Sequence, residues 1–230
     1  MQRLFLCFML FAGCRAIPAS LTGESAQDYI NRGNVLRDQG EHDKAIAAFT
    51  EAIRIDPKDD SAYFNRGLAW RSKGEYDLAI RDYNQALTIN PAFFQVYVNR
   101  GVAWSKKGEY DQALRDYNEA LRLRPNDPST YNNLAWLQAT CPDAKYRDGK
   151  KAIENASRAC QTDAGHWYCI GTLAAAYAES GDFGRAKALQ TSAIQMAATD
   201  KSVTDKDKAE MNSRLELYQQ GKPYREELKR

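Results

Sequence analysis

Residues 63–91 read YFNRGLAWRSKGEYDLAIRDYNQALTINP, and residues 97–125 read YVNRGVAWSKKGEYDQALRDYNEALRLRP. The two segments keep a spacing of 34 residues, and the Asn-Arg-Gly at residues 31–33 marks a third copy one period earlier. Self-similarity at a fixed period of this length is typical of a stack of identical supersecondary units. Such stacks mostly present a binding surface and rarely carry out chemistry.

Each copy has the pattern of two short helices joined by a tight turn. In the first copy, we expect helices over residues 26–39 and 43–55. Gly40 follows the first helix, at a place where glycine adopts the left-handed conformation without steric cost. Pro57 ends the second helix, because proline cannot continue a helix and disfavours helical geometry in the residue before it.

Apolar and small residues of the copies indicate how the two helices pack. Ala45, Phe49 and Ala52 are spaced at i, i+4 and i+7, which places them on one helix face. The first helices carry a glycine at the same position in every copy, namely Gly33, Gly67 and Gly101. Small residues let helices approach closely, so these glycines are predicted contact points within each hairpin.

This pattern resembles the tetratricopeptide repeat (TPR), a helix-turn-helix unit of the same length. The resemblance implies an all-α fold, a right-handed superhelical TPR solenoid of about five repeats with a C-terminal capping helix. The predicted repeats cover residues 26–57, 60–91, 94–125, 128–164 and 167–198, and the capping helix covers 203–220. Residues 132–224 also look like the closing module of many bacterial TPR proteins, which implies a bacterial source.

The chain departs from the TPR pattern at three arginines. Arg32, Arg66 and Arg100 stand where the family usually carries leucine. Asp82 and Asp116 on the second helices are candidate ion-pair partners, whereas the first repeat has alanine at the equivalent position. The alternative is that these arginines pack through their aliphatic stems and hold no fixed partner.

Residues 1–19 do not follow the repeat and form a predicted secretory leader. A basic start, an apolar run over residues 4–12 and small residues after it are typical of a signal peptide, and the run is too short to span a membrane. Residues 11–14 resemble a bacterial lipoprotein box, so Cys14 is a candidate for lipidation. The alternatives are ordinary cleavage after Ala16 or Ala19, an uncleaved anchor, and a cytoplasmic protein with an apolar N-terminus.

Three cysteines lie outside the leader: Cys141, Cys160 and Cys169. Cys160 is predicted at the end of one helix and Cys169 at the start of the next, and neighbouring antiparallel helices bring such ends together. In an exported protein these two are therefore the candidate disulfide, and Cys141 has no partner. Three buried thiols are the alternative.

The sequence carries no recognised catalytic, metal or cofactor motif. The two histidines, His42 and His166, lack further ligands at metal-binding spacing, and no glycine-rich phosphate loop occurs. An unrecognised active site at the insertion over residues 140–149 is a remote alternative. Arg3 and Arg15 of the 32 basic residues lie in the leader, so the rest balances the 30 acidic residues. This charge balance argues against nucleic-acid binding.

The TPR resemblance implies a peptide-binding groove lined by the first helix of each repeat. Asparagine amides can hold a peptide backbone, and apolar side chains can form pockets between them. The basic residues of the chaperone-type carboxylate clamp are replaced by Ile30, Gln95 and Asn99, so a C-terminal carboxylate is not an expected ligand. An ordinary solvated helix face is the alternative for every position. The predicted groove residues are Asn31, Asn34, Arg37, Phe64, Asn65, Leu68, Arg71, Val98, Asn99, Val102, Lys106, Asn132 and Asn133.

The predicted function is a non-catalytic interaction scaffold or adaptor of the bacterial cell envelope, binding a protein or extended peptide in this groove. We expect no enzyme activity, no cofactor and no nucleic-acid partner. We expect membrane contact only through a lipid anchor at Cys14, and otherwise a periplasmic location. The alternative is a structural assembly protein that self-associates through its repeat ends.

Overall fold

The computed structural model describes residues 23–162 and 166–227, so the predicted leader and Cys14 lie outside the described residues. Within this part the regular structure is helical, with eleven α-helices, one short 3-10 helix and no strand. The helices are α1 (Ala26–Asp38), α2 (His42–Ile55), α3 (Asp60–Ser72), α4 (Tyr76–Ile89), α5 (Phe94–Lys106), α6 (Tyr110–Leu123), α7 (Pro128–Thr140), η2 (Ala144–Tyr146), α8 (Gly149–Thr162), α9 (Trp167–Glu179), α10 (Phe183–Ala197) and α11 (Asp205–Gln219). No helix within the described residues has both the length and the hydrophobicity needed to cross a membrane.

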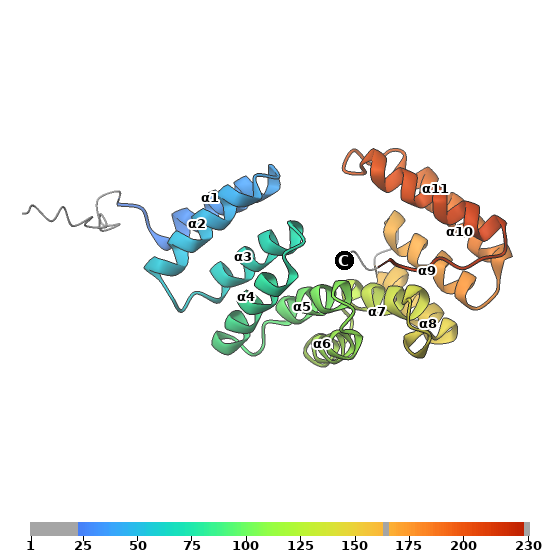
Figure 1. Cartoon of the computed structure of the whole chain (residues 1–230), viewed down its shortest axis with the longest axis horizontal. Helices are drawn as coiled ribbons and strands as arrows, with labels where there is room; N and C mark the ends of the chain where they lie inside the picture. Colours follow the sequence, from blue (N-terminus) through green and yellow to red (C-terminus); the bar gives the residue numbers. More distant parts are fainter. Residues whose placement is uncertain (1–22, 163–165, 228–230) are drawn as a thin grey trace, which may run out of the picture.

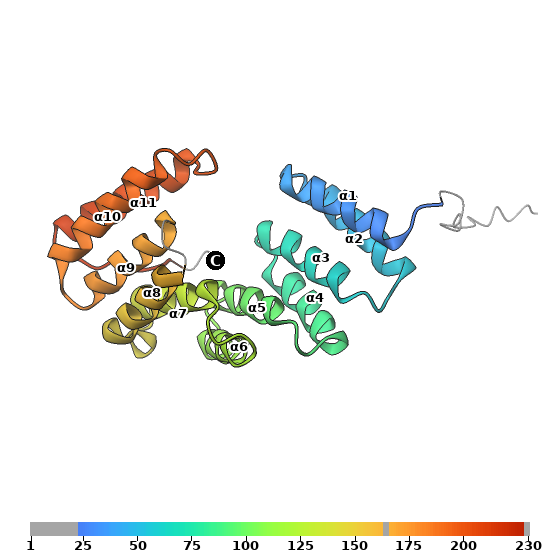
Figure 2. The ribbon, with the colours of Figure 1, turned by 180° about the vertical axis from the view of Figure 1, so that it is seen from behind.

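Consecutive helices pair into five hairpins, α1–α2, α3–α4, α5–α6, α7–α8 and α9–α10, and α11 packs on α10. The hairpins stack into an arc, with α1 at one end and α11 at the other facing it across the opening (Figure 1). In this view α5 and α7 lie on the inner side of the arc, and α6 lies outside them. The view from behind shows the same arc and the same open side (Figure 2). The first helices of the hairpins therefore line a concave face.

The glycines predicted as helix contacts are confirmed in that role. A Cβ atom added at Gly33 would lie 2.5 Å from Cε1 of Phe49, and one at Gly67 would lie 2.6 Å from Cε1 of Tyr83. Gly101 stands in the same relation to Tyr117, also at 2.6 Å. These rings are almost fully buried. In the first three hairpins, the aromatic residue of the second helix therefore packs directly against the backbone of the first helix.

The turns within four of the five hairpins, all except α7–α8, require glycine. Gly40, Gly74, Gly108 and Gly181 have φ angles of 78° to 85°, in the left-handed region that other residues adopt at a cost. The amide of the residue after Gly74, Glu75, donates back to the carbonyl of Trp70, and Glu109 does the same toward Trp104. The same turn therefore recurs along the stack.

Two of the three arginines form the predicted ion pairs, and they also join neighbouring repeats. Arg66 donates from Nε and Nη2 to the Asp82 carboxylate at 2.7 and 2.8 Å, and from Nη1 to Thr50 Oγ1 of the preceding repeat at 3.1 Å. Arg100 forms the equivalent bonds with Asp116. Its Nη1 reaches Asn84 of the preceding repeat at 2.6 Å. Arg32, which has alanine opposite, pairs with Glu24 instead.

The last repeat closes onto α11 through a glutamine. Gln190 stands where the second helices of the first three hairpins carry an aromatic residue, and it is fully buried. Its Nε2 donates to the carbonyl of Met211 on α11 at 2.9 Å. Met211 and Tyr218 of α11 are themselves buried. The edge of the last repeat, whose exposure would have favoured self-association, is therefore covered by α11.

Candidate functional site

The N-terminal half of the concave face uses several of its predicted groove residues for internal contacts. Arg37 on α1 donates from Nη1 to Asn65 Oδ1 on α3 at 2.8 Å. Asn65 Nδ2 donates to the Ser61 carbonyl at 2.8 Å, and Asn99 Nδ2 donates to the Gln95 carbonyl at 2.7 Å. Asn31 accepts from Gln27 at 2.9 Å. These asparagines are thus partly engaged by their own or neighbouring helices.

The predicted apolar residues differ in how much surface they expose. Phe64 packs against Phe93 with ring centroids 5.0 Å apart, and Val98 is buried. Leu68 and Val102 are partly buried against the core.

Two further predicted groove residues, Asn34 and Arg71, each carry a buried polar atom without a hydrogen-bond partner. These atoms are Oδ1 of Asn34 and Nε of Arg71.

The C-terminal half of the concave face encloses a cavity of about 270 Å³. Four of the predicted groove residues meet around it, namely Val102, Lys106, Asn132 and Asn133. Trp136, Trp167, Tyr168, Met211 and Arg214 complete much of the remaining lining. The cavity thus combines an aromatic wall with cationic and amide groups from α5, α7, α9 and α11, the composition expected of a ligand pocket.

The part of the cavity next to α9 is open because of a residue change in the fifth repeat. Gly171 on α9 lines the cavity and occupies the position of Gly67 in the earlier repeat. A Cβ atom at Gly171 would have its nearest neighbour, Gln190 Oε1, at 3.9 Å, compared with 2.6 Å between the equivalent atom at Gly67 and the Tyr83 ring. Replacement of the packed aromatic by glutamine therefore leaves this part of the groove more loosely packed than the equivalent place in the first three repeats.

The chain after α11 runs back into the concave face. It turns at Gly221, whose φ is 68°, and crosses toward α7 as the dark red segment of Figure 1. The Glu226 amide donates to the Thr140 carbonyl at 2.9 Å. Its carboxylate accepts from Trp136 Nε1 at 3.1 Å and pairs with Lys106. We call residues 222–227 the C-terminal strap.

Charge binds the strap to the groove. Burial by itself would lower the pKa of Lys106, but the Glu226 carboxylate outweighs it, so the pKa of this lysine is raised. Tyr224 of the strap lies 5.8 Å from Trp136 between ring centroids. Arg214 of α11 lies over both rings, at 5.3 Å from Trp136 and 5.8 Å from Tyr224. The aromatic ring of Tyr224 therefore packs against Trp136 and Arg214. The carboxylate of Glu226 meets Lys106 and the Trp136 indole N–H.

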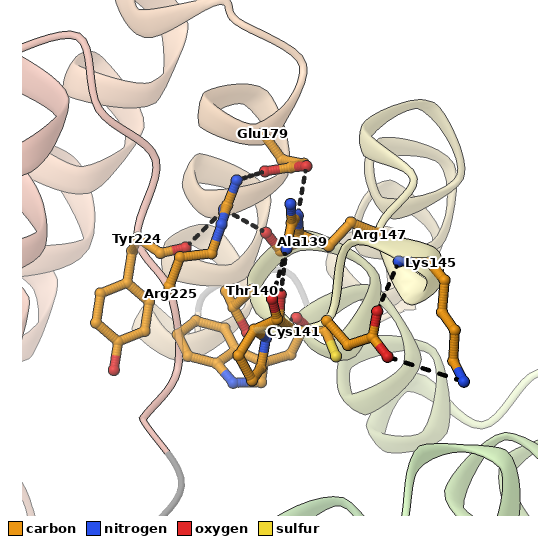
Figure 3. Close-up of polar contacts among 11 residues, drawn as sticks. Ala139, Thr140, Cys141, Lys145, Arg147, Glu179, Tyr224 and Arg225 are labelled. Atoms are coloured by element: carbon orange, nitrogen blue, oxygen red, sulfur yellow. Dashed lines mark hydrogen bonds and ion pairs between the residues drawn. The ribbon is translucent and has the colours of Figure 1, made fainter. Parts of the chain in front are cut away.

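A second ion-pair cluster anchors the strap and the insertion at one residue. Figure 3 shows Arg147 of the insertion and Arg225 of the strap converging on Glu179 at the end of α9. Arg147 Nε lies 3.0 Å from Glu179 Oε1, and Arg225 Nη2 lies 2.6 Å from Oε2. Arg147 also donates to the Cys141 carbonyl at 2.8 Å. Glu179 therefore couples the path of the strap to that of the insertion.

The insertion packs as a structural element. A Cβ atom at Gly149 would lie 2.8 Å from the Ser180 amide, so the end of the insertion sits directly on the turn between α9 and α10. None of residues 141–149 lines the cavity described above. Within the described part of the chain, no group of three or more His, Cys, Asp or Glu side chains is placed to hold a metal ion.

The cysteines are distributed as their helices place them. Cys141 is buried at the end of α7, and burial raises the pKa of its thiol. Cys169 is buried at the start of α9, where its Sγ donates to the His166 carbonyl at 3.2 Å. Cys160 lies near the end of α8, and residues 163–165 between the two helices are outside the described part. The Cys160–Cys169 disulfide stays a prediction.

Comparison with known proteins assigns the repeats. Residues 30–93 and 94–127 match family models described as tetratricopeptide repeat. Residues 30–127 are tetratricopeptide repeats. The TPR fold extends beyond them, because solved TPR structures align with most of the chain, and the predicted all-helical TPR solenoid is confirmed. A search of curated proteins found no significant match.

Solved structures with this TPR fold come from several sources. One is a chain of the APC/C hetero-tetramer Cut9-Hcn1, with 17% identity and a TM-score of 0.74, aligned over 86% of this chain and 37% of that one. A thermophilic TPR protein of Thermus thermophilus has 18% identity and a TM-score of 0.67, over 85% and 100% of the two chains. YrrB, described as a TPR protein with an unusual peptide-binding site, has 21% identity and a TM-score of 0.55, over 77% and 89%. At these identities the likeness shows the fold alone.

The strap is the part of the site that sequence reasoning missed. Gly221 and Pro223 indicate where α11 ends, but neither residue indicates where the chain goes next. Trp136 and Lys106 stand at groove positions of the repeat pattern. Their shared partner, Glu226, lies 120 residues after Lys106, beyond the reach of any local pattern.

Proposed function

We propose that this protein is a non-catalytic interaction scaffold whose concave face binds an extended segment of a protein partner. TPR solenoids in general present surfaces for protein interaction and are not typical enzymes. The observation that carries the proposal is the cavity of about 270 Å³, around which Val102, Lys106, Asn132 and Asn133 meet. Aromatic walls with a few convergent polar groups suit a peptide whose side chains alternate between pockets and solvent.

The proposed location is the bacterial cell envelope. This part of the proposal rests on the leader at residues 1–19 and on the lipoprotein-like sequence ending at Cys14. Intact-mass spectrometry of the protein from membrane and soluble fractions tests it. A chain beginning at a lipidated Cys14, or near Ile17 or Ser20, supports export, and an unprocessed chain beginning at Met1 in the cytoplasm refutes it.

A peptide-display selection tests the binding function. We would select random 12-residue peptides on the whole protein and measure their affinities for wild type and for Asn133→Asp, which places a charge in the cavity wall. Arg81→Glu on the outward-facing helix α4 is the control, because Arg81 is exposed. We expect the groove variant to weaken binding at least about tenfold and the control to leave it unchanged. Failure to select any peptide, or equal loss in both variants, would refute the function.

Self-association through the first repeat is the second candidate function. Val35 on α1 and Ile55 on α2 are the large hydrophobic residues that stand exposed in the described part of the chain, at 56% and 38%. Both belong to the end of the stack that no further helix of the described residues covers (Figure 1). Sedimentation over a range of concentrations tests this candidate, and Val35→Glu is expected to abolish any dimer.

A further inference from the structure

The C-terminal strap makes the contacts that a bound peptide would make. It is extended, without helix or strand over residues 222–227. Its backbone bonds to α7 through the Glu226 amide and the Thr140 carbonyl at 2.9 Å. One side chain, Tyr224, packs on Trp136, and another, Glu226, meets both Trp136 Nε1 and Lys106. A backbone bond, an aromatic contact and a charge-assisted bond are together the elements of groove recognition of a peptide.

The strap leaves part of the groove unused. Glu226 lines the cavity of about 270 Å³, and two other residues of its lining, Asn132 and Arg214, each hold a buried polar atom without a hydrogen-bond partner. Glu226 also lines a wider hollow of about 680 Å³, together with Tyr224 of the strap, Lys106, Trp136, Arg214 and acidic residues that include Glu210. A longer peptide could therefore keep the Glu226 interactions and add contacts in the cavity or in the hollow.

We propose that the strap is an intramolecular ligand of the groove, and that the partner is an extended peptide with a carboxylate side chain that takes the place of Glu226 on Lys106 and Trp136. This inference rests on the proposed function and specifies its ligand. The position of the Glu226 side chain favours a carboxylate, because Lys106 and Trp136 offer only N–H donors there. Arg214 adds a second positive charge to the lining. An aromatic residue two positions before the carboxylate fits the place of Tyr224 over Trp136.

A tethered segment competes strongly with an external peptide of the same chemistry. The strap follows directly after α11, and a short tether gives effective concentrations on the order of millimolar. The pairing of Arg225 with Glu179 holds the strap further in place. The groove is therefore expected to be closed to peptides that bind it weakly and open to those that also occupy the unused part. Weakening the strap should tighten external binding.

Fluorescence anisotropy with a labelled peptide tests the inference on the full chain. The probe is KPYREE, the sequence of residues 222–227, titrated with wild type and with Glu226→Gln. We expect Glu226→Gln to bind the probe roughly tenfold or more tightly than wild type, since its own strap has lost a charge-assisted bond. Glu216→Gln is the matched control, because Glu216 is an exposed carboxylate of α11 that lines neither the cavity nor the hollow, and it should behave as wild type.

Two further measurements make the result specific. The probe with glutamine in place of the first glutamate should bind Glu226→Gln roughly tenfold more weakly than the unmodified probe. Lys106→Met introduced together with Glu226→Gln should weaken binding of the unmodified probe to a similar degree, with the folded state checked by circular dichroism.

Three results would overturn the inference. Equal binding of the probe to wild type and Glu226→Gln would show that the strap does not compete, and absence of binding to both would show that it is not a ligand. A wild-type dimer that Glu226→Gln dissociates would place the strap of a second copy in the groove. Peptides selected from the random library that bind the groove despite any of these results would leave the proposed function intact.

Discussion

Arg66 and Asp82 are joined by two parallel hydrogen bonds, from Nε and Nη2 to the two carboxylate oxygens, at 2.7 and 2.8 Å. The carboxylate is 2% exposed and the guanidinium 14%. A third bond, from Nη1 to Thr50, carries the same arginine into the preceding repeat. One side chain thus joins the two helices of its own hairpin and also bonds to the preceding repeat, which a leucine at that position could not do.

Breaking this pair by removing one partner should be costly. Arg66→Leu leaves the Asp82 carboxylate buried without its partner, and we expect the free energy of unfolding to fall by about 3–5 kcal/mol. Adding Asp82→Ala, the residue of the first repeat at this position, should restore most of the loss. Arg32→Leu is the control, since Arg32 is 49% exposed and its pairing should contribute less than about 1 kcal/mol. Urea denaturation measures all four proteins. Equal effects of the two single arginine substitutions would contradict this account.

Two glycines at equivalent positions should respond in opposite ways to alanine. Gly67→Ala forces a Cβ atom to within 2.6 Å of the buried Tyr83 ring and should destabilise by about 1–3 kcal/mol. At Gly171 the nearest atom would lie 3.9 Å away, so alanine should be neutral or stabilising by up to about 1 kcal/mol through its helix propensity. Thermal denaturation followed by circular dichroism compares them. A large loss of stability in Gly171→Ala would show that the fifth repeat is as tightly packed as the second.

The raised pKa of the buried Asp116 carboxyl leads us to predict that stability depends on pH. Burial raises the pKa of this carboxyl above 3.8, against the opposing effect of Arg100. A raised pKa in the folded state means that the contribution of Asp116 to stability is fully present below its unfolded pKa and is lost as the pH rises through the folded pKa. Relative to Asp116→Asn, wild type should therefore lose unfolding free energy as the pH rises from 3 toward neutral. Urea denaturation of both proteins across this pH range measures the difference in unfolding free energy. A relative gain of wild-type stability with rising pH would contradict the prediction.

Glu179 should control two segments at once. Glu179→Gln removes the charge that both Arg147 and Arg225 meet, so hydrogen exchange should increase in residues 141–149 and in the strap. Arg225→Ala should increase exchange in the strap alone, because Arg147 keeps its partner. Hydrogen exchange read by mass spectrometry separates the two segments. Exchange that rises in the insertion in both variants would mean that the strap itself supports the insertion.

The repeat pattern was sufficient to predict the fold, because glycine, aromatic and proline positions recur with one period and each has a local steric role. It left the role of the arginines open, since a bidentate pair and a snorkelling side chain have the same sequence pattern. For the groove it predicted which helices line the concave face but not which side chains remain available. Asn65, for example, is engaged by Arg37 and by its own helix. The strap could not be predicted, because its partners lie on α5, α7 and α9, far away in sequence.

Observation of the four tryptophan indole N–H signals by 15N NMR tests the central claim most directly. Trp136 and Trp167 line the cavity, whereas Trp70 and Trp104 pack against the cores of the earlier hairpins. Addition of a selected peptide should shift the Trp136 signal, whose N–H donates to Glu226, and the Trp167 signal, and should leave that of Trp70 in place. Binding that shifts Trp70 while Trp136 stays unchanged would place the ligand elsewhere and contradict the groove as the binding site.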